Sequence, residues 1–443
     1  MKIIRNLFFT PLLYWLIAVS IVIIILSFMW PVLYGFGWAT FWTLLAVVLF
    51  DTLLLFVNRK GINGYRKHFN KLSNGDINQI NIFIANQYTF SVYIEVIDEL
   101  PFQFQRRDFL IQAEVKSGIT ENFSYTLIPK ERGEYFFGAL NVLVKTKIGL
   151  VKRRFEFDSG NIVPVYPSFL QMRKYELLAI SNSLTMSGIK KIRKVGNTSE
   201  FDQIKEYSEG DDYRTMNWKA TARRQKLMVN KYQDERAQNV YSLIDMGRIM
   251  QMPFDGMSLL DYAINSSLVI SNIAWKKHDK PGVIAFNHKV QNVLPAENRG
   301  SQMYRIQETL YNLKTNFLET DYERLLIFIR NKINQRSLLL LFTNFETLSG
   351  LKRQMKYLRK IAEGHLLIVI FFENTELRNM LDAPASNTRE IYYKTVAQKF
   401  EVEKRLIQRE LMTYGIQSIY TSPKNLSVNT INKYLEIKAR SVL

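Results

Sequence analysis

The chain has 443 residues, which is enough for roughly three domains. Its formal net charge of +19 suggests nucleic-acid binding, but basic and acidic residues are interleaved and no zinc-finger spacing, RNP-like aromatic motif or long basic block occurs. We therefore expect no nucleic-acid partner, because attraction of a membrane-attached protein to anionic lipid explains the charge more simply. The absence of cysteine excludes disulfides, thiol nucleophiles and thiolate zinc sites.

Two long apolar stretches, Leu7–Met29 and Phe36–Val57, occupy most of residues 1–57. At 1.5 Å per residue, each is long enough to cross a hydrocarbon core of about 30 Å. The alternative is a cleaved signal peptide followed by a buried core helix. However, the first stretch is too long for the apolar region of a signal peptide, lacks a convincing cleavage site and is followed directly by the second. The sequence therefore predicts two transmembrane helices.

Basic residues flank the outer ends of both stretches, whereas the loop between them carries no charge; these residues are Lys2, Arg5, Arg59, Lys60, Arg66 and Lys67. This asymmetry predicts that both termini and the soluble region lie in the cytoplasm, beneath the inner membrane. Asp51 lies about two turns inside the second stretch. An intramembrane carboxylate is a candidate functional group, but we favour an acid that packs against the helices or reaches the headgroups.

The soluble region begins with a polar, basic connector at residues 58–76. Residues 77–166 then alternate between apolar and polar positions, with turn residues between the runs, and predict a small antiparallel β-sandwich. The predicted strands are Phe90–Ile97, Phe109–Val115, Phe123–Ile128, Tyr135–Val144 and Val151–Phe157. Residues 167–237 are charged and only weakly periodic, which indicates a linker.

Residues 238–443 alternate between short apolar runs and longer amphipathic stretches. This pattern predicts βαβ units and a doubly wound, Rossmann-like α/β domain with a mostly parallel sheet. The predicted strands are Val240–Ile244, Val283–Phe286, Leu338–Phe342, Leu366–Phe372 and Gln417–Tyr420. The predicted helices are Leu259–Lys277, a pair within Gln302–Asn331, Leu348–Glu363, Thr388–Tyr414 and Val428–Arg440.

Ligands of such sheets bind at the carboxyl ends of the strands. The residues there are Asp245, Asn287, Thr343, Asn344, Glu373 and Asn374. No P-loop, GxGxxG, HExxH or paired-histidine spacing is present, so we assign no catalytic residue, nucleotide or small-molecule substrate. An enzyme with an unrecognised site at these strand ends is the alternative to a binding function.

The most distinctive stretch is Phe201–Arg223, here called the signature segment. It contains a tyrosine, Gly-Asp-Asp, an arginine, Trp-Lys and an Ala-Arg pair, contributed by Tyr207, Gly210, Asp211, Asp212, Arg214, Trp218, Lys219 and Arg223. Order and spacing resemble the signature of the bacterial domain-of-unknown-function family fifty-eight. Lys205 departs from the family, which usually has arginine there, so a planar bidentate group is replaced by a point charge. We expect the segment to serve structure or interaction, with Trp218 largely buried.

The resemblance extends to Arg132-Gly133-Glu134-Tyr135, to Ile148-Gly149-Leu150 and to the twin apolar stretches. It implies a membrane anchor, a sandwich and a von Willebrand factor A-like domain. Such domains often hold Mg²⁺ at a metal-ion-dependent adhesion site with an Asp-x-Ser-x-Ser loop. Here Asp245 is followed by Gly247 and Ile249 at the serine positions, Asn344 replaces a later acid, and Arg248 adds a cation. We expect a degenerate site without metal or cofactor, with Asp245 capping its loop or pairing with Arg248.

The sequence thus favours a non-enzymatic, membrane-anchored interaction or scaffold protein. The resemblance implies a protein partner, a MoxR-type AAA ATPase, in a cell-envelope or chaperone-like complex. A cell-envelope assembly factor that binds only its own copies is a third interpretation, which the sequence does not separate from the first.

Overall fold

The computed structural model describes residues 5–27, 30, 33–67, 70–158, 160–180, 200–209, 211–233, 237–382, 384 and 387–440. The chain divides into two compact units. The first comprises Met1–Pro129 and Gly133–Val165, and the second comprises Lys130–Arg132 and Tyr166–Leu443.

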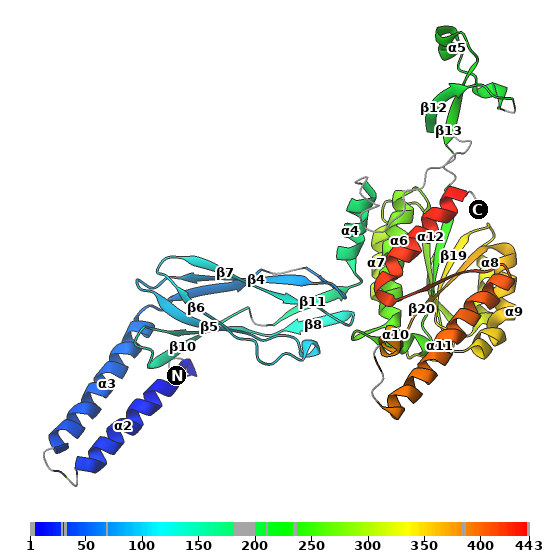
Figure 1. The fold of residues 1–443 in the computed structure, drawn as a ribbon. Coiled ribbons are helices and arrows are strands. Elements are labelled where there is room, and N and C mark those ends of the chain that lie inside the picture. The colour runs from blue at the N-terminus through cyan, green and yellow to red at the C-terminus, as the bar shows by residue number, and fades with distance from the viewer. Residues whose placement is uncertain are drawn as a thin grey trace. The chain divides into compact units, whose positions relative to one another are not determined.

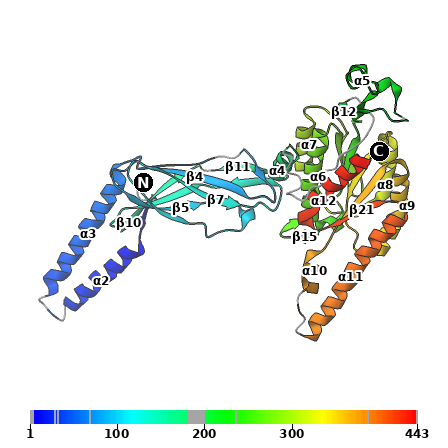
Figure 2. The same cartoon turned by 45° about the horizontal axis from the view of Figure 1, so that its top comes forward.

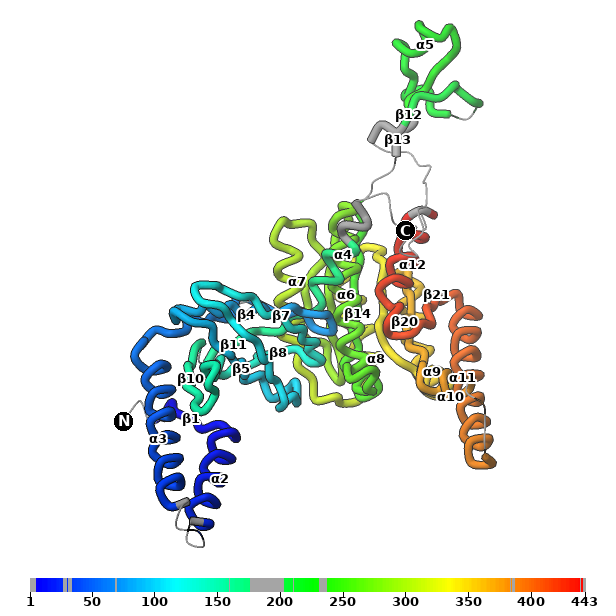
Figure 3. Tube along the Cα trace, turned by 60° about the vertical axis from the view of Figure 1, so that its left-hand side comes forward, coloured from blue at the N-terminus to red at the C-terminus, as the bar shows by residue number. Residues whose placement is uncertain are grey.

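Two apolar helices open the first unit, α2 (Pro11–Ser27) and α3 (Leu33–Val57). They lie side by side in both Figure 1 and Figure 3, and a Cβ atom at Gly37 would lie 3.1 Å from Ile24 Cγ1, so the backbones approach closely there. By length and composition, Tyr34–Val57 could cross a membrane, whereas the apolar helix Pro11–Leu26 is shorter.

The predicted start of the first helix is wrong. Leu7–Phe9 forms strand β1, which pairs antiparallel with β10 (Val151–Phe157), and the helix begins only at Pro11. Proline suits the first helical turn because its missing N–H has no partner there in any helix. The apolar run is therefore divided between a sheet edge and a helix.

The sandwich strands lie in three hydrogen-bonded sheets, β1-β10-β9-β5-β6, β2-β4-β7 and β3-β11-β8. Their bounds are β2 (Ile62–Arg66), β3 (Leu72–Ser73), β4 (Asn78–Asn86), β5 (Val92–Asp98), β6 (Ile111–Val115), β7 (Thr120–Leu127), β8 (Gly133–Phe137), β9 (Leu140–Lys145) and β11 (Asn161–Tyr166). Alternate side chains such as Ile82, Ile94 and Val142 share one apolar core. The predicted connector differs, since it contributes β2 and β3, and the run Tyr135–Val144 forms two strands rather than one.

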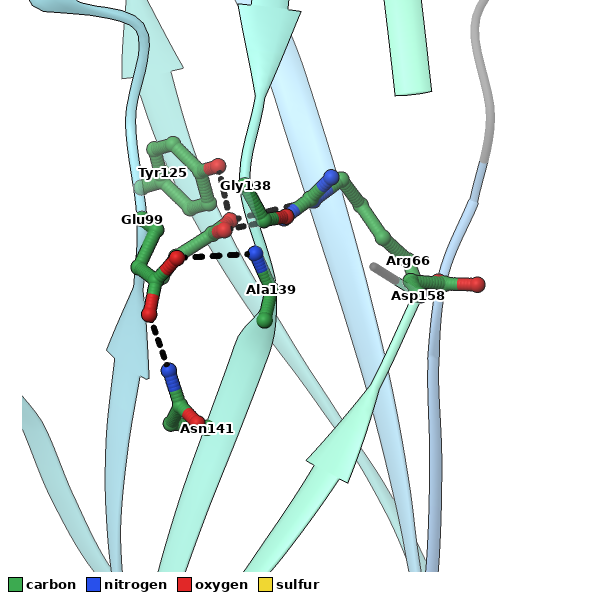
Figure 4. A network of polar contacts seen from close by, with 8 residues as sticks. Arg66, Glu99, Tyr125, Gly138, Ala139, Asn141 and Asp158 are labelled. Carbon is green, nitrogen blue, oxygen red and sulfur yellow. Dashed lines mark hydrogen bonds and ion pairs between the residues drawn. The ribbon is translucent and has the colours of Figure 1, made fainter. Parts of the chain in front are cut away.

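A buried polar network lies inside this unit (Figure 4). The Arg66 guanidinium forms an ion pair with Asp98, and both side chains are almost fully buried. The Tyr125 hydroxyl donates to the same carboxylate, and burial together with that negative charge raises the pKa of Tyr125. Arg66, one of the basic residues from which the sequence predicts the orientation in the membrane, is therefore an internal residue of the sandwich.

Asp51 joins helix α3 to the sandwich. Its carboxylate is fully buried and accepts hydrogen bonds from the Thr146 hydroxyl and from the backbone N–H groups of Leu150 and Val151, both at 3.1 Å. The acid therefore binds the turn between β9 and β10. This contact with a turn differs from the role favoured from the sequence, an acid that packs against the helices or reaches the headgroups.

The other helix ends are held by the same region. The Thr10 hydroxyl, just before α2, donates to the Gly149 carbonyl at 2.7 Å. The Arg153 guanidinium donates to the Leu55 carbonyl at the end of α3 and to the Asn58 carbonyl at 2.7 Å. A cation suits a helix carboxyl terminus, where unpaired carbonyls carry partial negative charge. Residues 146–153 therefore hold both helices.

The second unit contains a six-stranded sheet in the order β18-β17-β14-β19-β20-β21. All neighbours are parallel except the edge strand β18. The bounds are β14 (Asn239–Asp245), β17 (Lys280–Phe286), β18 (Val290–Leu294), β19 (Leu338–Phe342), β20 (Leu366–Phe372) and β21 (Gln417–Thr421). This confirms the predicted α/β region, although the sequence analysis missed β18.

Helices cover both faces of this sheet (Figure 2). One apolar core contains residues of α6, α7 and α12, and the other contains residues of α8, α9 and α11. The bounds are α6 (Leu259–Lys276), α7 (Gln302–Tyr311), α8 (Tyr322–Lys332), α9 (Leu348–Gly364), α10 (Thr375–Asp382), α11 (Thr388–Thr413) and α12 (Leu426–Arg440). Successive strand residues such as Leu340 and Leu341 enter opposite cores, which explains the unbroken apolar runs.

The predicted linker contains regular elements of its own, α4 (Phe169–Ile180), β12 (Glu200–Glu206), α5 (Trp218–Arg224) and β13 (Met228–Gln233). Strands β12 and β13 pair antiparallel. Most of the signature segment is therefore built on a β-hairpin that contains a short helix.

Candidate functional site

A cavity of about 450 Å³ lies at the carboxyl ends of β19, β20 and β21, within the range of about 300–1,000 Å³ typical of ligand sites. Its polar lining residues are Asn344, Glu346, Glu373, Asn374, Glu376, Arg378, Glu401, Lys404 and Tyr420, and its apolar lining includes Phe254, Leu259, Phe372, Leu377, Leu381, Ala397 and Phe400. Three of the strand-end residues singled out in the sequence, Asn344, Glu373 and Asn374, thus lie together, whereas Asp245 and Asn287 do not line this cavity.

Lys404 is the most unusual group in the cavity, because its side chain comes from α11 and is buried. Its ammonium donates to Asn344 Oδ1 at 2.8 Å and to the Phe345 carbonyl at 2.6 Å. Both acceptors are neutral, so they do not compensate the charge fully. Burial consequently lowers the pKa of Lys404 to about 8, although the carboxylates of Glu346 and Glu401 oppose the shift.

Lys404 is not among the residues predicted from the sequence, although α11 carries a signal for it. Ala397, Phe400, Lys404, Ile407 and Leu411 follow one another at helical spacings of three and four residues. Four of the five are apolar, and Ile407 and Leu411 belong to the core beside the sheet. A lysine in the core-facing stripe of an amphipathic helix indicates a buried amine.

We expect Lys404 to make the stability of the second unit depend on pH. Because its folded pKa of about 8 lies below the unfolded value of 10.5, the unfolded state binds more protons between these values. The free energy of unfolding should therefore rise by about 3 kcal/mol as pH increases from 8 to 10.5.

Differential scanning calorimetry of the detergent-solubilised chain can measure this rise. Lys404→Met should lack it, whereas Lys352→Met, which removes an exposed lysine of α9, should retain it. An equal pH dependence in the wild type and Lys404→Met would contradict the assignment.

Asp245 lies at the end of β14 and is saturated with hydrogen bonds from the protein. Its carboxylate accepts from the hydroxyls of Thr320 at 2.6 Å, Thr343 at 2.7 Å and Tyr322 at 3.2 Å, and from the Gly247 N–H at 2.8 Å. Burial raises the pKa of Asp245, and these donors oppose the shift. The hydroxyl donors lie at the start of α8, just before it and just after β19, so the sequence pattern around Asp245 gave no indication of them.

The degenerate adhesion-site positions differ in their surroundings. A Cβ atom at Gly247 would lie 1.9 Å from Thr320 Oγ1, so the loop excludes the serine side chain that a standard site has there. Ile249 is half-buried in a short 3-10 helix, and Arg248 is exposed. Of the two alternatives expected for Asp245, a cap on its own loop or a pair with Arg248, the structure shows the cap. Over the described ranges, no cluster of three or more His, Asp or Glu residues suited to a metal ion occurs.

Several signature residues bond within the β12–β13 hairpin. Lys205 forms an ion pair with Asp211 at 2.7 Å, and Asp211 also accepts from the Ser208 N–H at 2.9 Å. Asp212 caps a 3-10 turn by accepting from the Arg214 N–H at 3.0 Å, and Asn217 caps α5. The acids therefore shape the hairpin locally, and the Lys205 ammonium pairs with one of them.

The expected burial of Trp218 is wrong, because 68% of this residue is exposed. Tyr213 is 67% exposed, and the Arg214 guanidinium lies 5.7 Å from the centre of its ring. Lys219 and Arg223 are also exposed, as is Tyr207, while Gly210 lies outside the described residues. Only Met228 and Val229 are buried in the described part of the hairpin, so its small core does not enclose the large aromatic side chains.

Comparison with known proteins agrees with the resemblance over part of the chain. The chain is 25% identical over 218 residues to the uncharacterized protein YeaD of Bacillus subtilis (strain 168); the match covers 47% of this chain and 54% of that protein. The chain thus spans about half the length of this curated relative.

Two solved structures show weak similarity. A PapD-like domain of human CEP192 has 14% identity and a TM-score of 0.20, covering 24% of this chain and 87% of its own. Proximal thread matrix protein 1 of the mussel byssus has 13% identity and a TM-score of 0.28, covering 46% of this chain and 47% of its own. Neither score supports a conclusion about fold. Residues 203–382, however, match the family model described as protein of unknown function DUF58, which supports the resemblance seen in the signature segment.

Proposed function

We propose that this chain is a membrane-anchored interaction protein that recruits a protein partner to the cytoplasmic face of a bacterial inner membrane. One observation carries the proposal: Trp218 and Tyr213, which lie in the family signature, are mostly exposed rather than packed in a core. Tryptophan, tyrosine and arginine dominate the binding energy of protein interfaces, and Arg214 lies against the Tyr213 ring.

The exposed signature residues also define the charge of the partner. Arg214, Lys219, Arg223 and Arg224 are exposed around Trp218, so a complementary surface is acidic and carries a pocket for an aromatic side chain. The resemblance to the family suggests a MoxR-type AAA ATPase. Within this proposal, the α/β region is von Willebrand factor A-like, its degenerate site works without metal, and α2 and α3 both span the membrane with cytoplasmic termini.

An enzyme acting in the cavity is the second candidate, because Lys404 is a buried amine with a pKa lowered to about 8. Such an amine can serve as a base or a nucleophile near neutral pH. Loss of a reaction in Lys404→Met with partner binding intact would favour this candidate over the interaction function.

We expect the double variant Tyr213→Ala/Trp218→Ala to reduce binding of the ATPase by about tenfold or more, because two interface aromatics are removed. Co-purification of the tagged full chain with the co-expressed ATPase measures this loss, and repeating it in EDTA tests independence from metal. Stability should change little, since both side chains are exposed.

The matched control is Tyr304→Ala, because Tyr304 is also 67% exposed but lies on α7, outside the signature segment. It should bind the ATPase as the wild type does. Undiminished binding by the double variant, or abolished binding in EDTA, would overturn the proposed role of the segment.

A further inference from the structure

The apolar stripe of α11 continues beyond the part that packs on the sheet. Ile407 and Leu411 are buried in the core, whereas Tyr393, Val396 and Phe400, on the same side of the helix, are exposed. Phe400 also lines the cavity, so the cavity and the stripe form one surface. The stripe from residue 393 to residue 400 extends about 10 Å along the helix, at 1.5 Å per residue.

The neighbouring helix α10 extends this surface. Leu377 and Leu381 line the cavity, and Met380 is exposed. The Lys394 ammonium of α11 donates to the Leu381 carbonyl at 3.1 Å, which ties the two helices together. Exposed apolar side chains of α10 and α11 thus adjoin the cavity, and the cavity together with these side chains is called the groove below.

The groove is acidic although the chain as a whole carries a charge of +19. Four carboxylates and two basic groups line the cavity. Arg378 is paired with Glu373 at 2.6 Å, and the two hydrogen bonds of Lys404 are directed at Asn344 and Phe345. In contrast, the carboxylates of Glu346 and Glu376 are exposed and form no hydrogen bond or close ion pair with any residue that the structure describes. The charge of Glu346 acts on Lys404 only from beyond ion-pair distance.

We propose that this groove binds an apolar segment of a partner protein that carries arginine or lysine side chains. The apolar part of the segment packs on Phe400, Leu377 and the stripe, and its cations lie against Glu346 and Glu376. Charge complementarity excludes an acidic segment, because such a segment would place further carboxylates beside those of Glu346 and Glu376. The inference deepens the proposed interaction function and rests on it, but it concerns a different surface from that of Trp218.

The test uses the full chain in phosphatidylcholine nanodiscs, whose neutral lipid does not attract cationic peptides. The probe is a fluorescein-labelled octapeptide of alternating leucine and arginine, and fluorescence anisotropy measures its binding. Peptides of alternating leucine and glutamate and of alternating serine and arginine test the charge and the apolar requirement separately. Only the leucine–arginine peptide should bind well.

Two pairs of variants test the location. Glu346→Gln/Glu376→Gln should weaken binding about five- to tenfold, whereas Glu319→Gln/Glu363→Gln, which removes the same charge from exposed positions outside the cavity, should not. Leu377→Trp, which fills the cavity, should also weaken binding, whereas Ile327→Trp on the exposed side of α8 should not.

The inference would be overturned if all variants bound the leucine–arginine peptide equally well. It would also be overturned if the wild type bound the leucine–glutamate peptide as tightly as the leucine–arginine peptide. Failure here is distinguishable from failure of the proposed function. The Tyr213→Ala/Trp218→Ala variant should still bind the peptide, and co-purification of the ATPase is measured independently.

Discussion

Replacing Asp98 with alanine is expected to destabilise the sandwich by about 3–5 kcal/mol, because the variant leaves the buried guanidinium of Arg66 without its counter-charge. The Arg66 Nε donates to Asp98 Oδ2 at 3.2 Å, and both residues are less than 5% exposed. The Tyr125 hydroxyl would lose its acceptor as well. Hydrogen exchange, followed by mass spectrometry on peptides from β4 and β5, measures the opening of this unit in the detergent-solubilised chain.

The control for this prediction removes both charges. Arg66→Met/Asp98→Leu should recover much of the lost stability, because apolar replacement of a buried pair avoids the cost of desolvating two ions. The pair Arg154 and Glu156 offers a comparison, since both side chains are partly exposed at a distance of 3.2 Å. Breaking it with Glu156→Ala should cost less than about 1 kcal/mol. Similar losses from Asp98→Ala and Glu156→Ala would contradict the role given to burial.

Asp51→Ala is expected to cost about 2–6 kcal/mol and to loosen the attachment of α3 to the sandwich. The substitution leaves the backbone N–H groups of Leu150 and Val151 without their acceptor, and each unsatisfied buried donor costs about 1–3 kcal/mol. Hydrogen exchange reports on these two amides directly, because they donate to the carboxylate that is removed. Both amides should lose protection from exchange. The Thr146 hydroxyl should lose its hydrogen bond to the carboxylate as well.

Thr52→Ala is the matched control, because the Thr52 hydroxyl donates to the Val48 carbonyl of its own helix. It should leave the exchange of Leu150 and Val151 unchanged. Asp51→Asn should have an intermediate effect, since the amide keeps one oxygen but adds donors where only acceptors are needed. Unchanged protection at both amides in Asp51→Ala would show that the turn is held by other contacts.

The α/β region was the most predictable part of this protein. Leu338–Phe342 and Leu366–Phe372 are strands with the predicted bounds, and α9 differs from its predicted range by one residue. These elements are strongly patterned and are buried on both faces or along one stripe, so local composition specifies them. The strand-end rule also pointed to Asn344, Glu373 and Asn374, which line the cavity, but it pointed equally to Asp245, Asn287 and Thr343, which do not.

The N-terminal run was only partly predictable. Leu7–Phe9 is as apolar as the helix that follows, and its strand conformation depends on pairing with β10, more than 140 residues away. Strand β2 was not predicted either. In sequence Ile62–Arg66 resembles part of a polar connector, and its strand conformation depends on pairing with β4. Hydrogen bonds across such sequence distances leave no local periodicity.

Sequence by itself determined where the chain is apolar, where strands and helices alternate, and which segment carries a family signature. Tertiary structure alone decided the state of individual polar residues: Asp51 binds a turn of the sandwich, Asp245 is occupied by three hydroxyls, Lys404 is buried in a cavity, and Trp218 is exposed. The physical reason is that an element's type follows from the pattern of its own residues. The solvation and partners of a side chain depend instead on groups that only the folded chain brings within hydrogen-bond distance.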